Sequence, residues 1–175
     1  MRDTGTARHS QTVGRYAKLL ARELGLGDSA VERVHLAGVL HDVGKVGIPD
    51  SILQKPGALD DREWGEMKKH PELGARILQG ANLEDISGWV LAHHERPDGR
   101  GYPEGLARDE IPVPARILAV ADAYEAMTND RVYKAGISHT EAQAELLRCA
   151  GSQFDPDVVG VFIELIRREP ALVAA

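Results

Sequence analysis

Apolar residues recur at helical spacing along most of the chain. Between Val13 and Leu24 an apolar side chain returns every three or four residues, and Gly25 and Gly27 follow directly. This spacing predicts an amphipathic helix that ends near residue 24. The same pattern, bordered by Gly, Pro, Asp or Ser, predicts further helices. They cover residues 34–43, 60–78, 83–94 and 115–127, a segment that starts after residue 138, and a last segment from 156 to about 168.

Helix starts are marked by capping residues. Ser29 with Glu32 and Ser138 with Glu141 have the spacing of a capping box, and Asp155 with Pro156 fits an N-cap followed by the first helical position. Thr6 is placed to cap the first helix, which puts residue 9 on its first turn. Strand-like alternation is confined to residues 105–113, which fit an irregular turn or a hairpin. The sequence therefore predicts an all-α fold.

Length and charge limit the functions that need considering. The chain has 175 residues, 43% of them apolar and 27% charged, which suits one domain over residues 1–175. Its net charge of −6 argues against sequence-independent binding to long nucleic acid. Its apolar runs are too short to insert into a membrane, and its first residues do not resemble a signal peptide. The single Cys149 excludes an intrachain disulfide and is expected to pack in the core, so we expect a cytoplasmic protein.

Histidines and acids form the candidate chemistry. Five histidines and two aspartates occur in contexts that suit metal ligation: His9, His41, Asp42, His70, His93, His94 and Asp122. Seven ligands spread over five segments are too many for one ion. They suit two divalent metals bridged by a carboxylate, a site that hydrolyses phosphate esters.

The His41–Asp42 pair closes an apolar helix. Neighbouring residues on a helix point about 100° apart, so both side chains can reach one metal cluster. Asp42 is the candidate bridging ligand. Lys45 lies four residues after His41, on the same predicted helical face, where a cation can neutralise a substrate phosphate. Asp42 and Lys45 are therefore the predicted catalytic residues.

The run HHERPDGRGYP begins with His93 and His94 and opens the longest predicted loop, residues 97–114. Adjacent buried imidazoles are costly without partners, and the following Glu95 is a candidate to orient one of them. Tyr102, held between Gly and Pro, can stack on a base or bond a phosphate. The alternative is a loop tyrosine that covers the domain surface.

The remaining candidates each have an ordinary structural alternative. His70 precedes a proline, where histidine is often only a cap. Asp122 lies mid-helix among Ala and Val, where an unpaired carboxylate is expensive and metal ligation would explain it. Arg131 and Lys134 can clamp a phosphate, or can form a solvated basic turn. His35 and His139 have no ligand context and are read as structural or solvent-facing.

The motifs HDVGK, KKHPELG, HHERPDGRGYP, ADAYEAMTNDRVYK and GSQFDP occur in that order. Together they resemble the HD-GYP family of metal-dependent phosphohydrolases over nearly the whole chain. The resemblance implies a five-helix HD core followed by two C-terminal helices, and hydrolysis of cyclic di-GMP to pGpG and on to GMP. It carries the metal-ligand role to the seven residues named above, and implies that Asp42 bridges the metals and that Lys45 meets the scissile phosphate. It also implies substrate contacts for Tyr102, Arg131, Lys134 and Asp3.

Two positions depart from the family pattern. Gly5 stands where some members hold a third metal with a glutamate, so two metals are expected here. Glu125 stands where the family often has an aspartate. Mixed imidazole and carboxylate ligation suits Fe or Mn, with Zn, Co or Ni as substitutes. The resemblance also suggests signalling proteins or diguanylate cyclases as partners through the GYP loop, and a homodimer as an arrangement that HD proteins often adopt.

Three alternatives stay open at this stage. Relatives with decayed ligands bind cyclic di-GMP or partner proteins without cleaving the nucleotide, although here all seven ligands and Lys45 are present. An HD phosphohydrolase for another nucleotide is the second alternative. Against a nucleoside monophosphate stands the set Tyr102, Arg131 and Lys134, which exceeds what so small a ligand needs. The third alternative is a structural helical domain in which the histidines are incidental.

Overall fold

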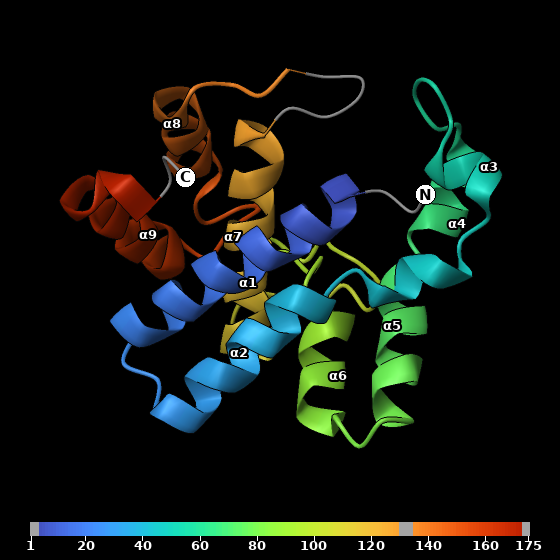
Figure 1. Ribbon diagram of the computed structural model, residues 1–175, viewed down its shortest axis with the longest axis horizontal. Helices are drawn as coiled ribbons and strands as arrows, with labels where there is room; N and C mark the ends of the chain where they lie inside the picture. The colour runs from blue at the N-terminus through green and yellow to red at the C-terminus, as the bar shows by residue number, and fades with distance from the viewer. Residues whose placement is uncertain (1–3, 130–134, 173–175) are drawn as a thin grey trace.

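The computed structural model describes residues 4–129 and 135–172, and helices make up its regular structure (Figure 1). Within these residues there is no β-strand, only an isolated bridge between Ala150 and Phe154. The predicted all-α class is confirmed. Among the described helices none is long and apolar enough to cross a membrane.

The helices follow one another with short connections, and three 3-10 turns (η) are interspersed. In chain order they are α1 (Thr4–Glu23), α2 (Asp28–Leu40), η1 (Val43–Gly47), α3 (Asp50–Leu53), α4 (Asp61–Met67), α5 (His70–Gln79), α6 (Glu84–Leu91), η2 (Arg108–Glu110), α7 (Val113–Thr128), α8 (His139–Cys149), α9 (Pro156–Arg168) and η3 (Pro170–Leu172).

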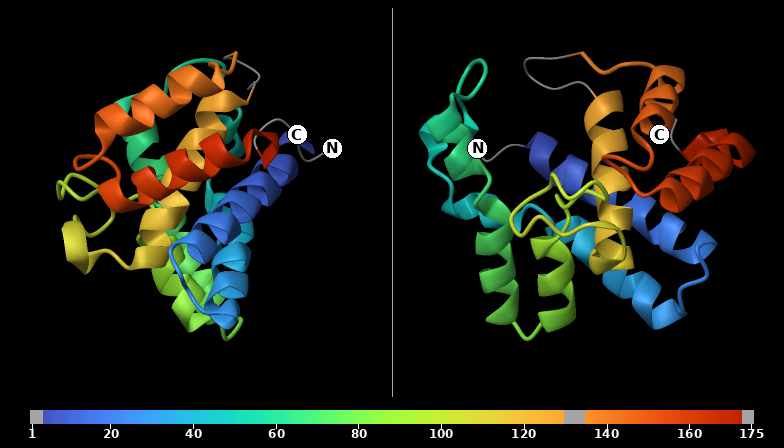
Figure 2. Two further views of the ribbon diagram at one scale, coloured as in Figure 1. Left: turned by 90° about the vertical axis from the view of Figure 1, so that its left-hand side faces the viewer. Right: turned by 180° about the vertical axis from the view of Figure 1, so that it is seen from behind.

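Helix α7 lies at the centre of the arrangement. In Figure 1 it runs behind α1, with α8 and α9 on one side and the α5–α6 hairpin on the other. Helix α1 packs along both α2 and α7, and η1 packs against α5. Figure 2 shows the same helices from two further directions. Helices α1, α2, α5, α6 and α7 correspond to the expected five-helix core and α8 and α9 to the two C-terminal helices, while the short helices α3 and α4 lie between α2 and α5.

Two glycines allow α1 and α2 to approach closely. A Cβ added at Gly38 would lie 2.6 Å from the Cα of Gly14, well inside van der Waals contact. Side chains there would push the two helices apart. Because α1 carries His9 and α2 leads into His41, this contact sets the distance between two candidate ligands.

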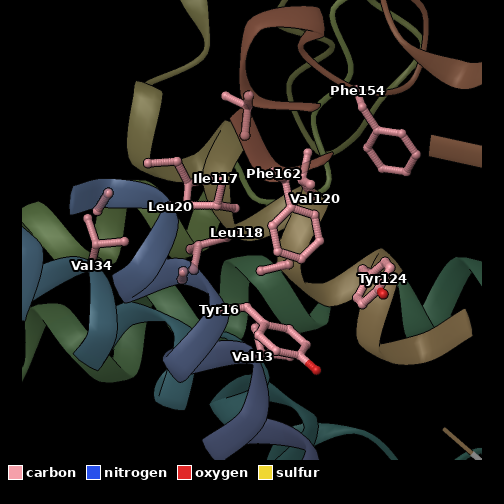
Figure 3. Close-up of a cluster of buried hydrophobic side chains, with 14 of the residues drawn as sticks. Val13, Tyr16, Leu20, Val34, Ile117, Leu118, Val120, Tyr124, Phe154 and Phe162 are labelled. Carbon is pink, nitrogen blue, oxygen red and sulfur yellow. The ribbon is translucent and has the colours of Figure 1, made fainter. Parts of the chain in front are cut away.

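The main core joins α9 to α1 and α7 through aromatic side chains (Figure 3). The ring of Tyr124 lies 4.9 Å from that of Phe162, and both are 5.8 Å from the ring of Tyr16, measured between centroids. Cys149 is buried in this core, as predicted. These contacts hold α7 against α1 and fix the helix that carries Asp122.

Two of the predicted helix caps are not observed. Helix α1 begins at Thr4, so Thr6 is not its cap. Helix α2 begins at Asp28 without a side-chain cap, so the predicted capping box of Ser29 and Glu32 does not form. The capping box at Ser138 and the N-cap at Asp155 are confirmed. Residues 105–113 form an irregular turn around η2 rather than a hairpin.

The predicted helix 60–78 is two helices. It breaks between α4 and α5 because Pro71 has no N–H to donate to the carbonyl of Met67. The ring Nδ1 of His70 bonds that carbonyl instead, at 2.8 Å. The break therefore turns His70 towards the interior, where it is buried.

Candidate metal centre

Three buried histidines are oriented by the same kind of hydrogen bond. Each follows the end of a helix, where the last carbonyls have no intrahelical partner, and its ring Nδ1 donates to the carbonyl three residues earlier. The pairs are His41 to Gly38 (2.7 Å), His70 to Met67 (2.8 Å) and His93 to Val90 (2.5 Å). A carbonyl can only accept, so Nδ1 carries a proton in each ring. Burial lowers the pKa of His70 and His93, so their Nε2 atoms hold a lone pair, whereas for His41 the carboxylate of Asp42 outweighs burial and raises the pKa.

The rings of these three histidines are neighbours, and their Nε2 atoms share one property. All three are buried and have no hydrogen-bond partner. The ring centroids of His41 and His70 each lie 5.4 Å from that of His93. Three buried ring nitrogens without hydrogen-bond partners are expensive unless a ligand uses them. A divalent cation fits this requirement, since the second ring nitrogen of a metal-ligating histidine normally donates to a carbonyl or carboxylate.

Asp42 lies between two groups of histidines. Its Oδ1 is 3.4 Å from the Nε2 of His70, and its Oδ2 is 3.4 Å from the Nε2 of His41 and 3.9 Å from the Nε2 of His9. Burial raises the pKa of Asp42, but His41 and Lys45 outweigh it and hold the pKa well below its usual range. The carboxylate is therefore ionised, with one oxygen facing each group.

Asp42 and Lys45 do not lie on the predicted helix. Helix α2 ends at Leu40, and Lys45 lies in the 3-10 turn η1. The tighter turn still brings the ammonium of Lys45 to 2.6 Å from Oδ2 of Asp42. The prediction that His41, Asp42 and Lys45 share one helix was wrong, because the chain tightens beyond the helix end.

His9 and Asp122 complete this side of the site from α1 and α7. The Nε2 of His9 lies 3.3 Å from Oδ1 of Asp122. The ring of His9 lies mid-helix, where the nearby carbonyls are already bonded, so its Nδ1 bonds the carboxylate of Glu125 instead. Glu125 is buried and also accepts from the side-chain amide of Asn129 at 2.8 Å.

The orienting role of Glu125 is the functional feature that sequence reasoning missed. The residue was noted only as a departure from the family's aspartate. The available signal was its position three residues after Asp122 on one helix, which places both carboxylates on one face. Glu95 was the predicted orienting residue, and that interpretation was wrong. Its Oε1 accepts from the backbone N–H groups of Glu104 and Gly105, so it shapes the loop.

The ligand atoms fall into two clusters. His9, His41 and Asp42 form one, and His70, His93 and His94 form the other. Within each cluster the ligand atoms lie within 4.8 Å of one another. Burial lowers the pKa of His93 well below its usual value and that of His94 to about 4. Neutral imidazoles are the form that binds a metal, so the second cluster is ready to bind.

Tyr102 forms one wall of the second cluster. Its ring stacks on that of His94, with centroids 4.9 Å apart and an interplanar angle of 28°. Its N–H donates to the carbonyl of His94 at 3.2 Å. The loop therefore covers His94 with an aromatic ring, so Tyr102 belongs to the site and not to a remote surface.

The remaining predicted residues are not part of the two clusters that the structure describes. Asp3, Arg131 and Lys134 fall outside the described residues. His139 bonds the hydroxyl of Tyr124 at 2.9 Å and supports the core, as its lack of ligand context predicted.

Comparisons with known proteins agree with this arrangement. The model of the HD domain family matches residues 1–158. A cyclic di-GMP phosphodiesterase of Thermotoga maritima is 42% identical over 94% of this chain and 45% of its own length. A 3'3'-cGAMP-specific phosphodiesterase of Vibrio cholerae is 42% identical over 93% of the chain and 31% of its own length. The chain thus spans less than half of either relative.

A solved structure gives the same fold. An HDG"Y"P protein from Bdellovibrio bacteriovorus superposes with a TM-score of 0.74 over 93% of this chain and 52% of its own, at 22% identity. The fold, the paired His41–Asp42 and the family match over most of the sequence lead to one conclusion: the chain belongs to the HD domain family.

Proposed function

We propose that this chain is a metal-dependent phosphodiesterase of the HD-GYP type that hydrolyses cyclic di-GMP to pGpG and on to GMP. The observation that carries the proposal is the position of Asp42, with one carboxylate oxygen towards each histidine cluster. The name of the Thermotoga maritima relative, a cyclic di-GMP phosphodiesterase, supports the choice of substrate.

The donor set fits a pair of divalent ions. His9, His41 and Asp122 would hold one, His70, His93 and His94 the other, and Asp42 would bridge them. Imidazole with carboxylate suits Fe or Mn, with Zn, Co or Ni as substitutes. Such a pair, when bound, polarises the phosphate and supplies a nucleophilic water at neutral pH.

The protein's own residues would position and neutralise the substrate. Lys45 is about one-third exposed (37%), so its ammonium can turn from Asp42 to a phosphate oxygen. There it would stabilise the charge that develops on the phosphate during in-line attack. Tyr102 would bound the pocket on the His94 side and exclude water from it. Arg131, Lys134 and Asp3 remain predicted substrate contacts.

A second substrate is favoured by a specific observation. The Vibrio cholerae relative named as 3'3'-cGAMP-specific is as similar to this chain as the cyclic di-GMP phosphodiesterase is, at 42% identity in each case. A hybrid cyclic dinucleotide is therefore the alternative substrate. It presents the same phosphodiester to the same ligands and differs only in one base.

The test is a substrate panel on anaerobically purified protein of known metal content. Cyclic di-GMP, 3'3'-cGAMP and linear pGpG are each incubated with the enzyme, and products are separated by chromatography. We expect fastest cleavage of cyclic di-GMP. Preference for 3'3'-cGAMP would favour the alternative, and binding without cleavage by metal-loaded protein would make the chain a sensor module. Protein partners and a homodimer stay predictions.

A further inference from the structure

Lys68 differs from the other described lysines in its surroundings. Four of the five have a carboxylate within ion-pair distance, in the pairs Lys18–Glu32, Lys45–Asp42, Lys55–Glu63 and Lys69–Glu66. In the part of the chain that the structure describes, Lys68 has no carboxylate partner. Its ammonium lies over two aromatic rings instead, 5.4 Å from the centroid of Tyr102 and 5.8 Å from that of Trp64.

These contacts place a cation at the rim of the metal centre. Tyr102 stacks directly on His94, so Lys68 is one aromatic ring away from a candidate ligand. The backbone at Lys68 is fixed, because its N–H donates to the carbonyl of Trp64 at 3.0 Å where α4 ends. Two residues later the chain reaches His70. The same break between α4 and α5 that turns His70 inwards thus sets Lys68 beside the loop of Tyr102.

The ammonium of Lys68, which contacts aromatic rings and no carboxylate among the described residues, is available to bind an anion. A partly exposed cation–π contact is worth about 0.5–1 kcal/mol. A charge-assisted bond to a phosphate is about twice as strong as a neutral hydrogen bond and would replace that contact without breaking an ion pair. Trp64, nearly half exposed, flanks the ammonium and limits its freedom.

We propose that Lys68 binds the second phosphate of a cyclic dinucleotide, the one that is not being cleaved. This inference rests on the proposed function. A cyclic dinucleotide carries two phosphates on opposite sides of its macrocycle. When one lies against Lys45 at the metal centre, the other needs a separate cation. Lys68 supplies it on the Tyr102 side, and this preference for two phosphates selects cyclic dinucleotides over esters with one.

The neighbouring lysine provides a matched control. Lys69 is exposed and its ammonium lies 2.7 Å from Oε1 of Glu66. Lys68→Ala and Lys69→Ala therefore remove the same charge from adjacent positions, and only the first removes it from the site. Lys68→Arg keeps the cation and is the conservative variant.

The experiment measures kcat and KM for cyclic di-GMP and for a mononucleotide p-nitrophenyl diester, which carries one phosphate. We expect Lys68→Ala to raise KM for cyclic di-GMP by a factor about ten times larger than the factor for the one-phosphate ester. This ratio reflects the loss of one ionic contact. Lys68→Arg should restore most of the loss, and Lys69→Ala should match wild type.

Two outcomes would contradict the inference about Lys68 and leave the proposed function standing. In one, wild type cleaves cyclic di-GMP but Lys68→Ala behaves like Lys69→Ala. In the other, Lys68→Ala raises KM for both esters equally, which indicates a structural role. If metal-loaded wild type neither binds nor cleaves any cyclic dinucleotide, the proposed function fails and this inference fails with it.

Discussion

Asp42 Oδ1 lies 3.4 Å from the Nε2 of His70, although the two residues belong to different segments of the chain. Gly44 makes this proximity possible. The turn η1 presses against the start of α5 so closely that a Cβ at Gly44 would collide with the carbonyl oxygen of His70 and the amide nitrogen of Gly74. The position of Asp42 between the two clusters therefore depends on a glycine that carries no functional group.

Substituting Gly44 by Ala should damage both the fold and the site. The new methyl group meets backbone atoms, which cannot move aside as a flexible side chain can. We expect a loss of about 2–3 kcal/mol in the free energy of unfolding, measured by denaturant titration, together with weaker metal binding. Gly160→Ala is the control, since a Cβ there meets nothing within 4 Å in α9. It should be neutral or stabilise the protein. Equal behaviour of the two variants would contradict the packing argument.

Glu125 should control metal affinity through His9. Replacing Glu125 by Ala removes the acceptor that orients the ring of His9. We expect metal affinity to fall about 10- to 100-fold, as for other residues that orient a ligand imidazole. Glu125→Gln keeps an acceptor oxygen and should lose less. Competition with a chromogenic chelator measures the effect.

The control for Glu125 is an acid far from the site. Glu164 is exposed on α9 and pairs with Arg167, so Glu164→Ala removes a carboxylate without touching a histidine. It should bind metal as wild type does. Wild-type affinity in Glu125→Ala would show that His9 needs no orienting partner.

Metal binding should release a proton from His9. Burial lowers the pKa of His9 in the metal-free protein, but hydrogen bonds to Asp122 and Glu125 outweigh it and raise the pKa to about 9. The ring is thus protonated near neutral pH, and a metal must displace that proton. We expect affinity to rise from pH 7 to pH 9. Calorimetry in buffers of different ionisation enthalpy counts the protons released.

The same proton affects the stability of the metal-free protein. The pKa of His9 is higher in the folded chain than its ordinary 6.5, so its contribution is complete below about pH 6.5 and is lost as pH rises through about 9. Replacing His9 by Gln should abolish this loss and reduce proton release on metal binding. Unchanged release in that variant would assign the proton to another group.

Much of the fold followed from local patterns in the sequence. Apolar spacing located the long helices, and Ser138 and Asp155 marked two helix starts that the structure confirms. Ser29 failed as a cap because α2 begins one residue earlier, at Asp28. The sequence pattern did not predict the break before His70, because the helical spacing of apolar residues continues across it. The break follows from the missing N–H of Pro71, which removes one backbone hydrogen bond.

The candidate ligands were predictable as residue types but not as an arrangement. The motifs identified His41, Asp42 and His93, and the structure brings them together. The distances between them depend on tertiary contacts that no spacing reveals, such as the close approach of η1 to α5 at Gly44. The opposite roles of Glu95 and Glu125 illustrate this, since the glutamate next to the histidines shapes a loop and the distant one orients a ring.

Metal content measured together with hydrolysis, on wild type and Asp42→Ala, tests the central claim most directly. The Asp61→Ala variant, which removes an exposed acid at the start of α4, is the control. With Asp42 as the shared ligand, wild type and Asp61→Ala should hold two divalent ions per chain and cleave cyclic di-GMP, and Asp42→Ala should lose both properties together. An Asp42→Ala protein that keeps its metals and its turnover would contradict the account.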